Sequence, residues 1–307
     1  MSEPQQGATG PETKDDGLTP EQRVAGLLTL LDVQPVPGEE RAFIGLRKPG
    51  GVGRVYGGQV VAQALVAAMK TAPEDRPVHS LHAYFLRGGD EAQKVGYRVE
   101  ADFEGRSFAN RRVIAEQKEG VILNLAASFH KREAGRDYQA PMPRVDAPEN
   151  LPTVAEYLAD HPDCANPLTL RFLSRPGPME IRCIGVPPLC VTEPMEPALS
   201  FWFRTTAPVR ADQPLHRALL AYASDLALLT TSMRPHGAFR YQVASLDHSL
   251  WFHRDVQADD WLLYQIASPW SGAARGLSFG HFYDRAGNLV ATAAQEGLIR
   301  EVEPREE

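Results

Sequence analysis

The same order of sequence patterns occurs twice in this chain, and this repetition limits what the chain can fold into. Each copy has a helix of small apolar residues, a strand that ends in arginine and a hairpin that turns at glycine. Arg87 and Arg254 lie 167 positions apart (254 − 87), and so do Gly120 and Gly287 (287 − 120). A constant spacing across several elements indicates an internal repeat. We therefore expect two copies of one structural unit.

Each copy reads as a helix followed by antiparallel strands. The helices are expected over residues 57–69 and 221–233, and the strands that follow them over 79–87 and 245–254. The strands carry β-branched and aromatic residues, and the turns carry Gly, Asn and Asp, as hairpins require. A long apolar helix is buried when a curved antiparallel sheet wraps around it, which gives an α+β fold. Because open strand edges invite aggregation, the two sheets should join edge to edge.

Composition divides the chain into four segments. Residues 1–20 are rich in Gly, Pro and acidic residues and are expected to form a disordered leader. The first repeat should span residues 21–134 and the second, which carries the catalytic candidates, residues 178–303. Between them, residues 135–177 form a Pro-rich linker, in which T-V-A-E-Y-L-A-D (153–160) predicts a short helix.

Composition also excludes several classes of function. The net charge is −7, from 32 basic and 39 acidic residues, so no basic surface favours nucleic-acid binding. No apolar run reaches the ~20 residues that a membrane span needs. The N-terminus lacks the pattern of a secretion signal, and the C-terminal V-E-P-R-E-E is no peroxisomal address. Three cysteines (Cys164, Cys183 and Cys190) cannot all pair and match no metal site, so we expect a cytoplasmic protein.

Asp225 is the strongest candidate for a catalytic group. It interrupts A-L-L-A-Y-A-S-D-L-A-L-L (218–229), which is otherwise apolar almost all the way round a helix. Such a helix belongs in a core, where burying an unpaired carboxylate costs several kcal/mol. An Asp kept there is hydrogen-bonded by a specific partner or used in chemistry. The alternative is that Asp225 lies at a solvated helix end.

Two further polar residues of the second copy accompany Asp225. Ser245 is expected to begin the strand after the helix. Gln295 continues a strand face whose other members are Leu289, Ala291 and Ala293, because alternate residues of a strand share a face. Taken singly, each has an ordinary explanation: a strand-end serine bonded to backbone, or a solvated amide.

The first copy lacks these polar groups. The strand offset of 167 and the helix offset of 164 (Met69 to Met233) give the counterparts of the three candidates, which are Val78 for Ser245, Ser128 for Gln295 and Val61 for Asp225. This difference between the copies favours a single polar site, in the second copy.

Two glycine motifs suggest other functions on first reading. Residues 276–280, G-L-S-F-G, match the nucleophile elbow G-x-S-x-G, which works only between a strand and a helix. The residues after it keep alternating into a D-R-A-G-N turn, so Ser278 should lie in mid-strand. Residues 57–59, G-G-Q, lack the Lys and the spacing of a phosphate loop. They are expected to let the chain turn tightly into its helix.

The remaining titratable residues form no obvious site. No metal site is expected from the four strand histidines, which do not pair on one face and have no Cys or carboxylate cluster nearby: His79, His82, His248 and His253. Asp247 shares a face with Ser245 and is a rival general base. The alternative is a hydrogen bond from Asp247 to backbone or to a neighbouring side chain.

These motifs, in this order, resemble the acyl-CoA thioesterase II family. They are R-V-Y-G-G-Q-V-V-A-Q-A-L, H-S-L-H-A-Y-F-L-R, A-Y-A-S-D, V-A-S-L-D-H-S-L-W-F-H, S-P-W-S-G-A-A-R-G-L and A-Q-E-G-L-I-R, within residues 22 to 301. The resemblance implies a double hot-dog fold, with one hot-dog unit per repeat. It also implies hydrolysis of acyl-CoA to a free fatty acid and CoA, a reaction of lipid metabolism.

The resemblance also implies roles for the three candidates. In that family an Asp on the helix, a Ser or Thr on a strand and a Gln orient the attacking water, and these match Asp225, Ser245 and Gln295. It implies no cofactor, since CoA is part of the substrate, and association into a homo-oligomer. Two alternatives remain: a hot-dog enoyl-CoA hydratase or dehydratase, which usually pairs its carboxylate with a His, and a non-catalytic acyl-CoA-binding sensor.

Overall fold

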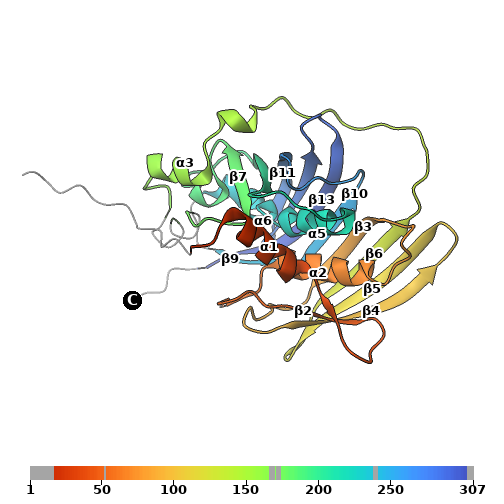
Figure 1. Cartoon of the computed structure of the whole chain (residues 1–307). Coiled ribbons are helices and arrows are strands. Elements are labelled where there is room, and N and C mark those ends of the chain that lie inside the picture. Colours follow the sequence, from red (N-terminus) through yellow and green to blue (C-terminus); the bar gives the residue numbers. More distant parts are fainter. Residues whose placement is uncertain (1–16, 52, 166–169, 171–173, 238–240, 303–307) are drawn as a thin grey trace, which may run out of the picture.

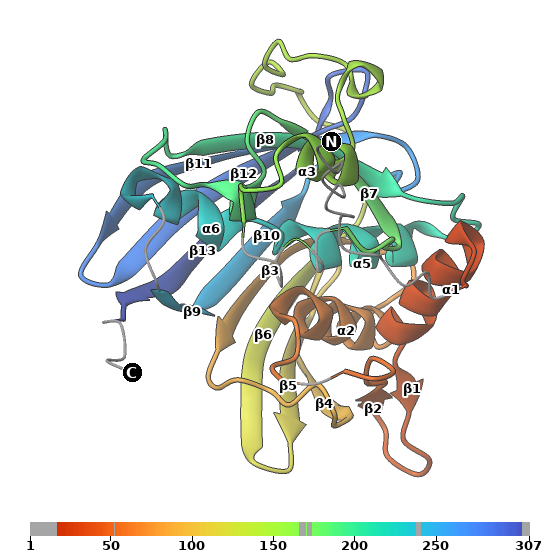
Figure 2. The same cartoon turned by 90° about the vertical axis from the view of Figure 1, so that its left-hand side faces the viewer.

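The computed structural model describes residues 17–51, 53–165, 170, 174–237 and 241–302. Most of the expected leader (residues 1–16) lies outside the described residues. A 13-stranded sheet forms the body of the protein, and helices pack against it (Figures 1 and 2). The α+β prediction is therefore confirmed.

The elements follow the order expected of two copies. The first contains β1 (Gln34–Pro35), β2 (Ala42–Gly45), α2 (Gly57–Met69), β3 (Val78–Phe85), β4 (Val95–Glu104), β5 (Phe108–Gln117) and β6 (Gly120–His130), after helix α1 (Pro20–Leu31). The second contains β7 (Met179–Ile184), β8 (Ala198–Thr205), α5 (Gln213–Ser224), α6 (Leu228–Met233), β9 (Tyr241–Ser245), β10 (Asp247–Phe252), β11 (Leu262–Gly272), β12 (Arg275–Tyr283) and β13 (Leu289–Glu301). The helix predicted within the linker is α3 (Val154–Asp160), which begins with a capping box formed by Thr153 and Glu156. Within the described residues, three 3₁₀ turns also occur, at Pro148–Asn150, Pro188–Cys190 and Arg234–His236.

The sheet has the symmetry that a repeat predicts. Its strand order is β1-β2-β4-β5-β6-β3-β10-β13-β12-β11-β8-β7, with β9 paired to β13. From one edge the order is β1-β2-β4-β5-β6-β3, and from the other it is β7-β8-β11-β12-β13-β10, so each strand of one repeat has its counterpart in the other. The two halves meet where β3 pairs with β10. At this seam Leu81 stands opposite Leu250, and His82 Nδ1 lies 3.0 Å from Ser249 Oγ. His82 and Ser249 are 167 positions apart, so a residue meets its own counterpart, as expected beside a two-fold axis.

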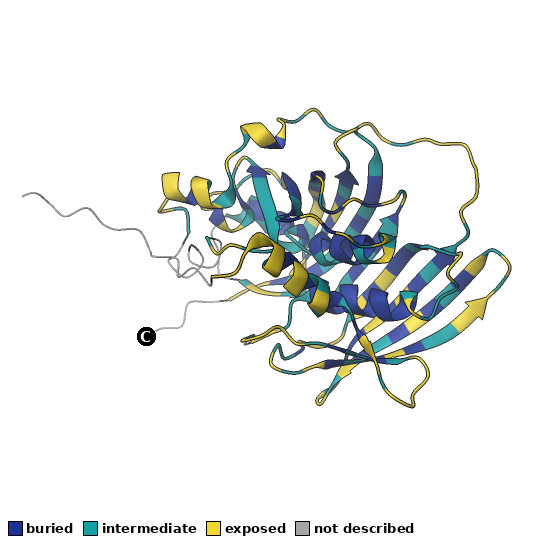
Figure 3. Ribbon diagram, in the orientation of Figure 1, coloured by how far each residue is buried: buried dark blue, intermediate teal, exposed yellow. Residues whose placement is uncertain are grey.

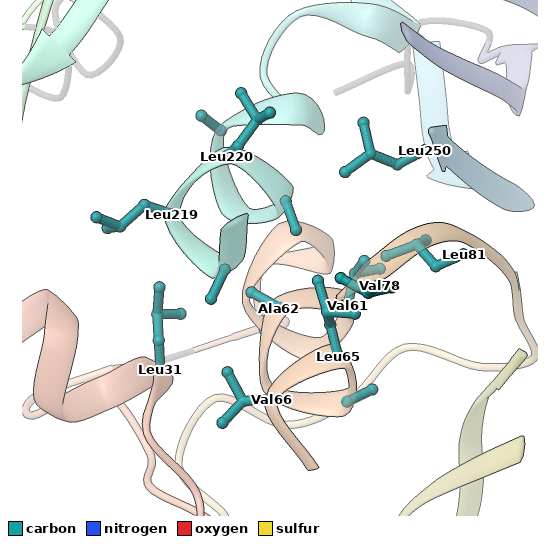
Figure 4. Close-up of a cluster of buried hydrophobic side chains, with 14 of the residues drawn as sticks. Leu31, Val61, Ala62, Leu65, Val66, Val78, Leu81, Leu219, Leu220 and Leu250 are labelled. Carbon is teal, nitrogen blue, oxygen red and sulfur yellow. The ribbon is translucent and has the colours of Figure 1, made fainter. Parts of the chain in front are cut away.

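The core is built around α2 and α5, which run antiparallel. Every residue of α2 from Gly58 to Ala68 is buried. Figure 4 shows side chains of α2, α5, β3 and β10 meeting in one cluster, for example Leu65, Leu220 and Leu250. Burying each such side chain contributes about 1.5–3 kcal/mol. Along the strands, buried and exposed residues alternate, as the stripes in Figure 3 show.

The second helix is interrupted, which corrects the expectation of one continuous helix over 221–233. Helix α5 ends at Ser224, Asp225 is its C-cap, and Ala227 adopts a left-handed backbone (φ 65°) before α6 begins. The last carbonyls of a helix need partners, and here side chains supply them. Tyr56 Oη donates to the Tyr222 carbonyl (3.0 Å), and Tyr264 Oη donates to the Ser224 carbonyl (2.7 Å). The helix can therefore end inside the core.

A second correction concerns Ser245, which ends β9 instead of beginning the next strand. Ser245 pairs with Gly297 of β13, whereas Ser249 of β10 pairs with Ala294, so the register shifts by one residue at Leu246. Such a bulge redirects the side chains beside it. The predicted strand over 245–254 is therefore split.

Candidate active site

The structure brings the three predicted site residues together. Gln295 Nε2 donates to Asp225 Oδ1 (2.6 Å) and lies 3.1 Å from Ser245 Oγ. Asp225 comes from the break between α5 and α6, Ser245 from the bulged end of β9, and Gln295 from the buried face of β13. Gln295 is 1% exposed, and its Oε1 has no hydrogen-bond partner among the described residues. An ionised carboxylate only accepts hydrogen bonds, which fixes the amide nitrogen toward Asp225.

The first repeat also contributes to this site, through the start of α2. Gly58 N donates to Asp225 Oδ2 (2.9 Å). A Cβ at Gly58 would lie 2.4 Å from the Tyr222 carbonyl oxygen, and one at Gly57 would lie 2.9 Å from Asp225 Oδ2. Neither glycine has a positive φ. The two glycines therefore serve close approach between the repeats and not the tight turn that we expected.

The surroundings of Asp225 make it a better base than an ordinary Asp. Loss of solvent around the carboxylate raises its pKa from 3.8 to about 6, while the hydrogen bonds from Gln295 and Gly58 oppose this rise. Asp225 is half-buried, so it keeps contact with solvent. The carboxylate is therefore mainly ionised at neutral pH, yet its pKa is close enough to 7 for proton transfer from water. Asp225 thus lies at a helix end, as the alternative proposed, but it is only partly exposed and is held by two hydrogen bonds.

A cavity of about 270 Å³ lies beside these groups. Gly57 and Phe85 of the first repeat line it together with Ser245 of the second. Arg54 and Arg87 also line it, and both side chains are exposed. The cavity thus connects Ser245, which Gln295 links to Asp225, with two cations at the surface.

A buried network holds the end of α5, and with it Asp225. Besides Tyr56 and Tyr264, His248 takes part, since its Nε2 lies 2.8 Å from Ser224 Oγ. The Ser224 hydroxyl donates to a carbonyl of its own helix (2.9 Å), so His248 Nε2–H is the donor in this pair. Complete burial lowers the pKa of His248 to about 4, so the ring is neutral. Sequence reasoning placed His248 on a strand but gave it no role.

Other candidates are placed elsewhere by the structure. Asp247 Oδ1 accepts a hydrogen bond from the Glu296 backbone N–H (2.8 Å), which confirms the backbone alternative for this residue. Ser278 lies within β12, as predicted, with no strand-to-helix elbow, and pairs in register with Gln295. Among the described residues, no group of His, Cys, Asp and Glu is arranged to hold a metal ion. Within the same part of the chain, no helix is long and apolar enough to cross a membrane.

Comparison with known proteins decides the family. Residues 195–298 match a profile described as acyl-CoA thioesterase, and residues 47–130 match one described as the acyl-CoA thioesterase N-terminal domain. The chain is 39% identical to acyl-coenzyme A thioesterase 8 of Homo sapiens, over 98% of this chain and 97% of that protein. It is 38% identical to acyl-CoA thioesterase 2 of Haemophilus influenzae, over 89% and 96% of the two chains. The chain belongs to the acyl-CoA thioesterase II family.

Solved structures agree with this assignment. The acyl-CoA thioesterase II TesB2 of Mycobacterium marinum superposes with a TM-score of 0.72 at 35% identity, over 92% of this chain and 100% of that one. A hot-dog protein of Alicyclobacillus acidocaldarius superposes with a TM-score of 0.71 at 18% identity, over 90% and 98% of the two chains. The second comparison bears on the fold alone. Both confirm that this acyl-CoA thioesterase II family member has the double hot-dog fold.

Proposed function

We propose that this chain hydrolyses acyl-CoA thioesters to a free fatty acid and CoA, with Asp225 as the general base. The observation that carries the proposal is the contact of Gln295 with both Asp225 and Ser245 beside a cavity. Family membership supports the same reaction.

In this mechanism a water molecule attacks the thioester carbonyl directly. Asp225 takes a proton from the water as the new C–O bond forms, and Ser245 and Gln295 orient the water. The C–S bond then breaks and the proton passes to the CoA thiolate. A thiol has a pKa near ~8.5, so the leaving group needs little acid catalysis. The backbone N–H of Gly57, which lines the cavity at the start of α2, is proposed to stabilise the oxyanion.

The phosphates of CoA need cationic partners near the cavity. Arg54 and Arg87 line it, and their exposed guanidinium groups fit phosphate recognition. We assign the phosphate contacts to these two residues as part of the proposal.

The geometry does not favour a hydratase or dehydratase. Such an enzyme usually pairs its carboxylate with a histidine, but His248 donates to Ser224 and is held neutral in the core. A sensor would use the same cavity without turnover, so an assay of turnover separates these functions.

The test is release of free thiol from palmitoyl-CoA by the full chain, by Asp225→Asn and by Asp247→Asn as the control carboxylate. We expect Asp225→Asn to lower kcat by two or more decades, the size of general-base loss, and Asp247→Asn to stay near the unsubstituted chain. Near-normal turnover by Asp225→Asn would refute the assignment. Hydration of crotonyl-CoA would indicate a hydratase, and tight binding without thiol release a sensor.

We further propose that the protein forms a homo-oligomer in the cytoplasm. Large apolar side chains remain exposed on the strands or beside them, such as Tyr84 (65%), Phe103 (56%) and Trp270 (43%), and association would cover them. All three cysteines are free, which suits a reducing compartment. Light scattering after gel filtration and cell fractionation test the two statements. A monomer, or a protein found in a membrane or organelle fraction, would contradict them.

A further inference from the structure

A second cavity, of about 880 Å³, lies at the opposite end of the α2–α5 pair. Lys70 after the last turn of α2 and Gln213 at the start of α5 both line it. So does Val78, the first-copy counterpart of Ser245, which lines the cavity beside Asp225. The second cavity therefore occupies the position in the repeat that corresponds to the active site.

This counterpart lacks the groups needed for hydrolysis. Val78 replaces the serine, and Lys70, the C-cap of α2, stands where the active site has Asp225, the C-cap of α5. The counterpart expected from the sequence, Val61, lies near the other end of α2. The strand pairing puts Ala127 in place of the glutamine and corrects the expectation of Ser128, since His82 pairs with Ala126 where its counterpart Ser249 pairs with Ala294. With no carboxylate aligned to a water, the cavity is not a second thioesterase site.

The cavity is nevertheless rich in cations for a protein of net charge −7. Five basic side chains line it against three acidic ones: Lys70, Arg76, Lys131, Arg132 and Arg217 against Glu74, Asp75 and Asp212. Ion pairs neutralise part of this charge, since Lys131 bonds to Asp75 (2.9 Å) and Lys70 to Asp32 (2.8 Å). Within the lining, bases outnumber acids by two, and Asp32 and Asp255 from outside it pair with three of these bases. Such a cluster of basic side chains favours an anionic ligand.

Arg217 is the clearest sign of a missing partner. Its side chain is 7% exposed and donates to the Val78 carbonyl (2.8 Å) and to Asp255 (3.1 Å). Its Nε has no acceptor among the described residues. Asp255, which is 45% exposed, also pairs with Arg132, so two arginines share one carboxylate. A buried guanidinium beside a cavity, with one N–H that has no acceptor among the described residues, indicates a place for an anion.

Helix α5 adds to this preference. It has 12 residues, and its N-cap, Asp212, makes no side-chain cap hydrogen bond to the first turn. The positive end of the helix dipole therefore faces this region and favours a phosphate there. The first turn adds few free N–H groups, since Pro214 has none and the Leu215 N–H donates to the Asp212 carbonyl (3.1 Å). Met69, Val78 and Phe129 give the cavity an apolar wall. The volume falls in the range of ~300–1,000 Å³ that small-molecule sites occupy.

We propose that this second cavity binds an organic phosphate of the CoA or nucleotide type without hydrolysing it. The phosphates would meet Arg217, the Lys131–Arg132 pair and the start of α5, and the rest of the molecule would lie against the apolar wall. The proposal is independent of the catalytic assignment.

The experiment is calorimetric titration of CoA into the full chain. We expect two CoA molecules per chain, one in each cavity. The double variant Lys131→Gln/Arg132→Gln should bind the second CoA at least tenfold more weakly. A matched variant, Lys94→Gln/Arg98→Gln, removes two charges from outside both cavities and should keep two sites. Both target side chains are well exposed (40% and 65%), and circular dichroism checks that the fold is intact.

Competition identifies the ligand chemistry. Displacement by ADP at the Lys131–Arg132-dependent site shows that the nucleotide part is held, and displacement by CoA alone shows that the whole molecule is held; either supports the site. One CoA per chain in all three proteins, or a second site that the double variant leaves unchanged, overturns the proposal. Thiol release from palmitoyl-CoA is measured on the same samples. If the chain hydrolyses palmitoyl-CoA but binds only one CoA, the proposal for the second cavity is refuted and the catalytic proposal stands. If it binds two CoA molecules but does not hydrolyse palmitoyl-CoA, only the catalytic proposal is refuted.

Discussion

Replacing Asp225 by Asn should make the folded protein more stable at neutral pH. Asp225 has a pKa of about 6 in the fold against 3.8 unperturbed. Because the folded value is the higher one, the folded protein keeps its proton between about pH 4 and 6, and unfolding releases it. Stability is therefore lost as pH rises through this window. A rise of about 2 units corresponds to about 3 kcal/mol in the free energy of unfolding, which is present below about pH 4 and lost by about pH 7.

Urea unfolding of both proteins at pH 5, 6, 7 and 8 measures this loss. The Asn variant shares every other titrating group, so the difference between the two free energies of unfolding isolates Asp225. We integrate the linkage relation with these pKa values. Between pH 5 and pH 8, the unsubstituted chain should lose about 1.4 kcal/mol of its free energy of unfolding relative to the Asn variant. A difference that stays constant across this range would refute the argument that desolvation raises the pKa of Asp225.

Four further predictions follow from the site. Gly58→Ala should lower the melting temperature and abolish most activity, because a Cβ there lies 2.4 Å from a carbonyl oxygen of α5; an active variant of normal stability would contradict the close approach. The pH profile of kcat/KM should rise through about pH 6 as Asp225 ionises and then level off; a flat profile from pH 5 to 8 would count against it. Tyr264→Phe loses the hydrogen bond that holds the end of α5, worth about 1 kcal/mol, and should lower kcat and shift that inflection while KM changes little; an unchanged profile would remove its positioning role. The double substitution Arg54→Gln/Arg87→Gln should raise KM for acyl-CoA, more at low salt, without lowering kcat. An unchanged KM would show that other residues bind the phosphates.

Much of this architecture could be predicted from the sequence because the repeat is a long-range signal. The spacing of 167 residues predicted two copies of one unit, and the need to cover open strand edges predicted that their sheets join. The pairing of β3 with β10 bears this out. The trio of Asp225, Ser245 and Gln295 emerged because the second copy has polar groups where the first has small or apolar ones. Their mutual contacts then follow from the fold.

Local patterns could not show where the chain departs from regularity. The break after Ser224 depends on donors from Tyr56 and Tyr264, which lie far away in sequence. An apolar run reads as one helix when such donors are unknown. The bulge at Leu246 depends on the register against β13. The bond from Gly58 to Asp225 crosses between the repeats, and only the packing of α2 on α5 creates it.

The central claim is that water attacks the thioester carbonyl directly with Asp225 as base. A single turnover of palmitoyl-CoA in H₂¹⁸O, with the full chain in excess, tests it by mass spectrometry of both the fatty acid and the peptide containing Asp225. Direct attack puts one ¹⁸O into the fatty acid and none into the peptide. Label in Asp225 with an unlabelled fatty acid would mean that the carboxylate itself attacks the substrate, and the account would be wrong.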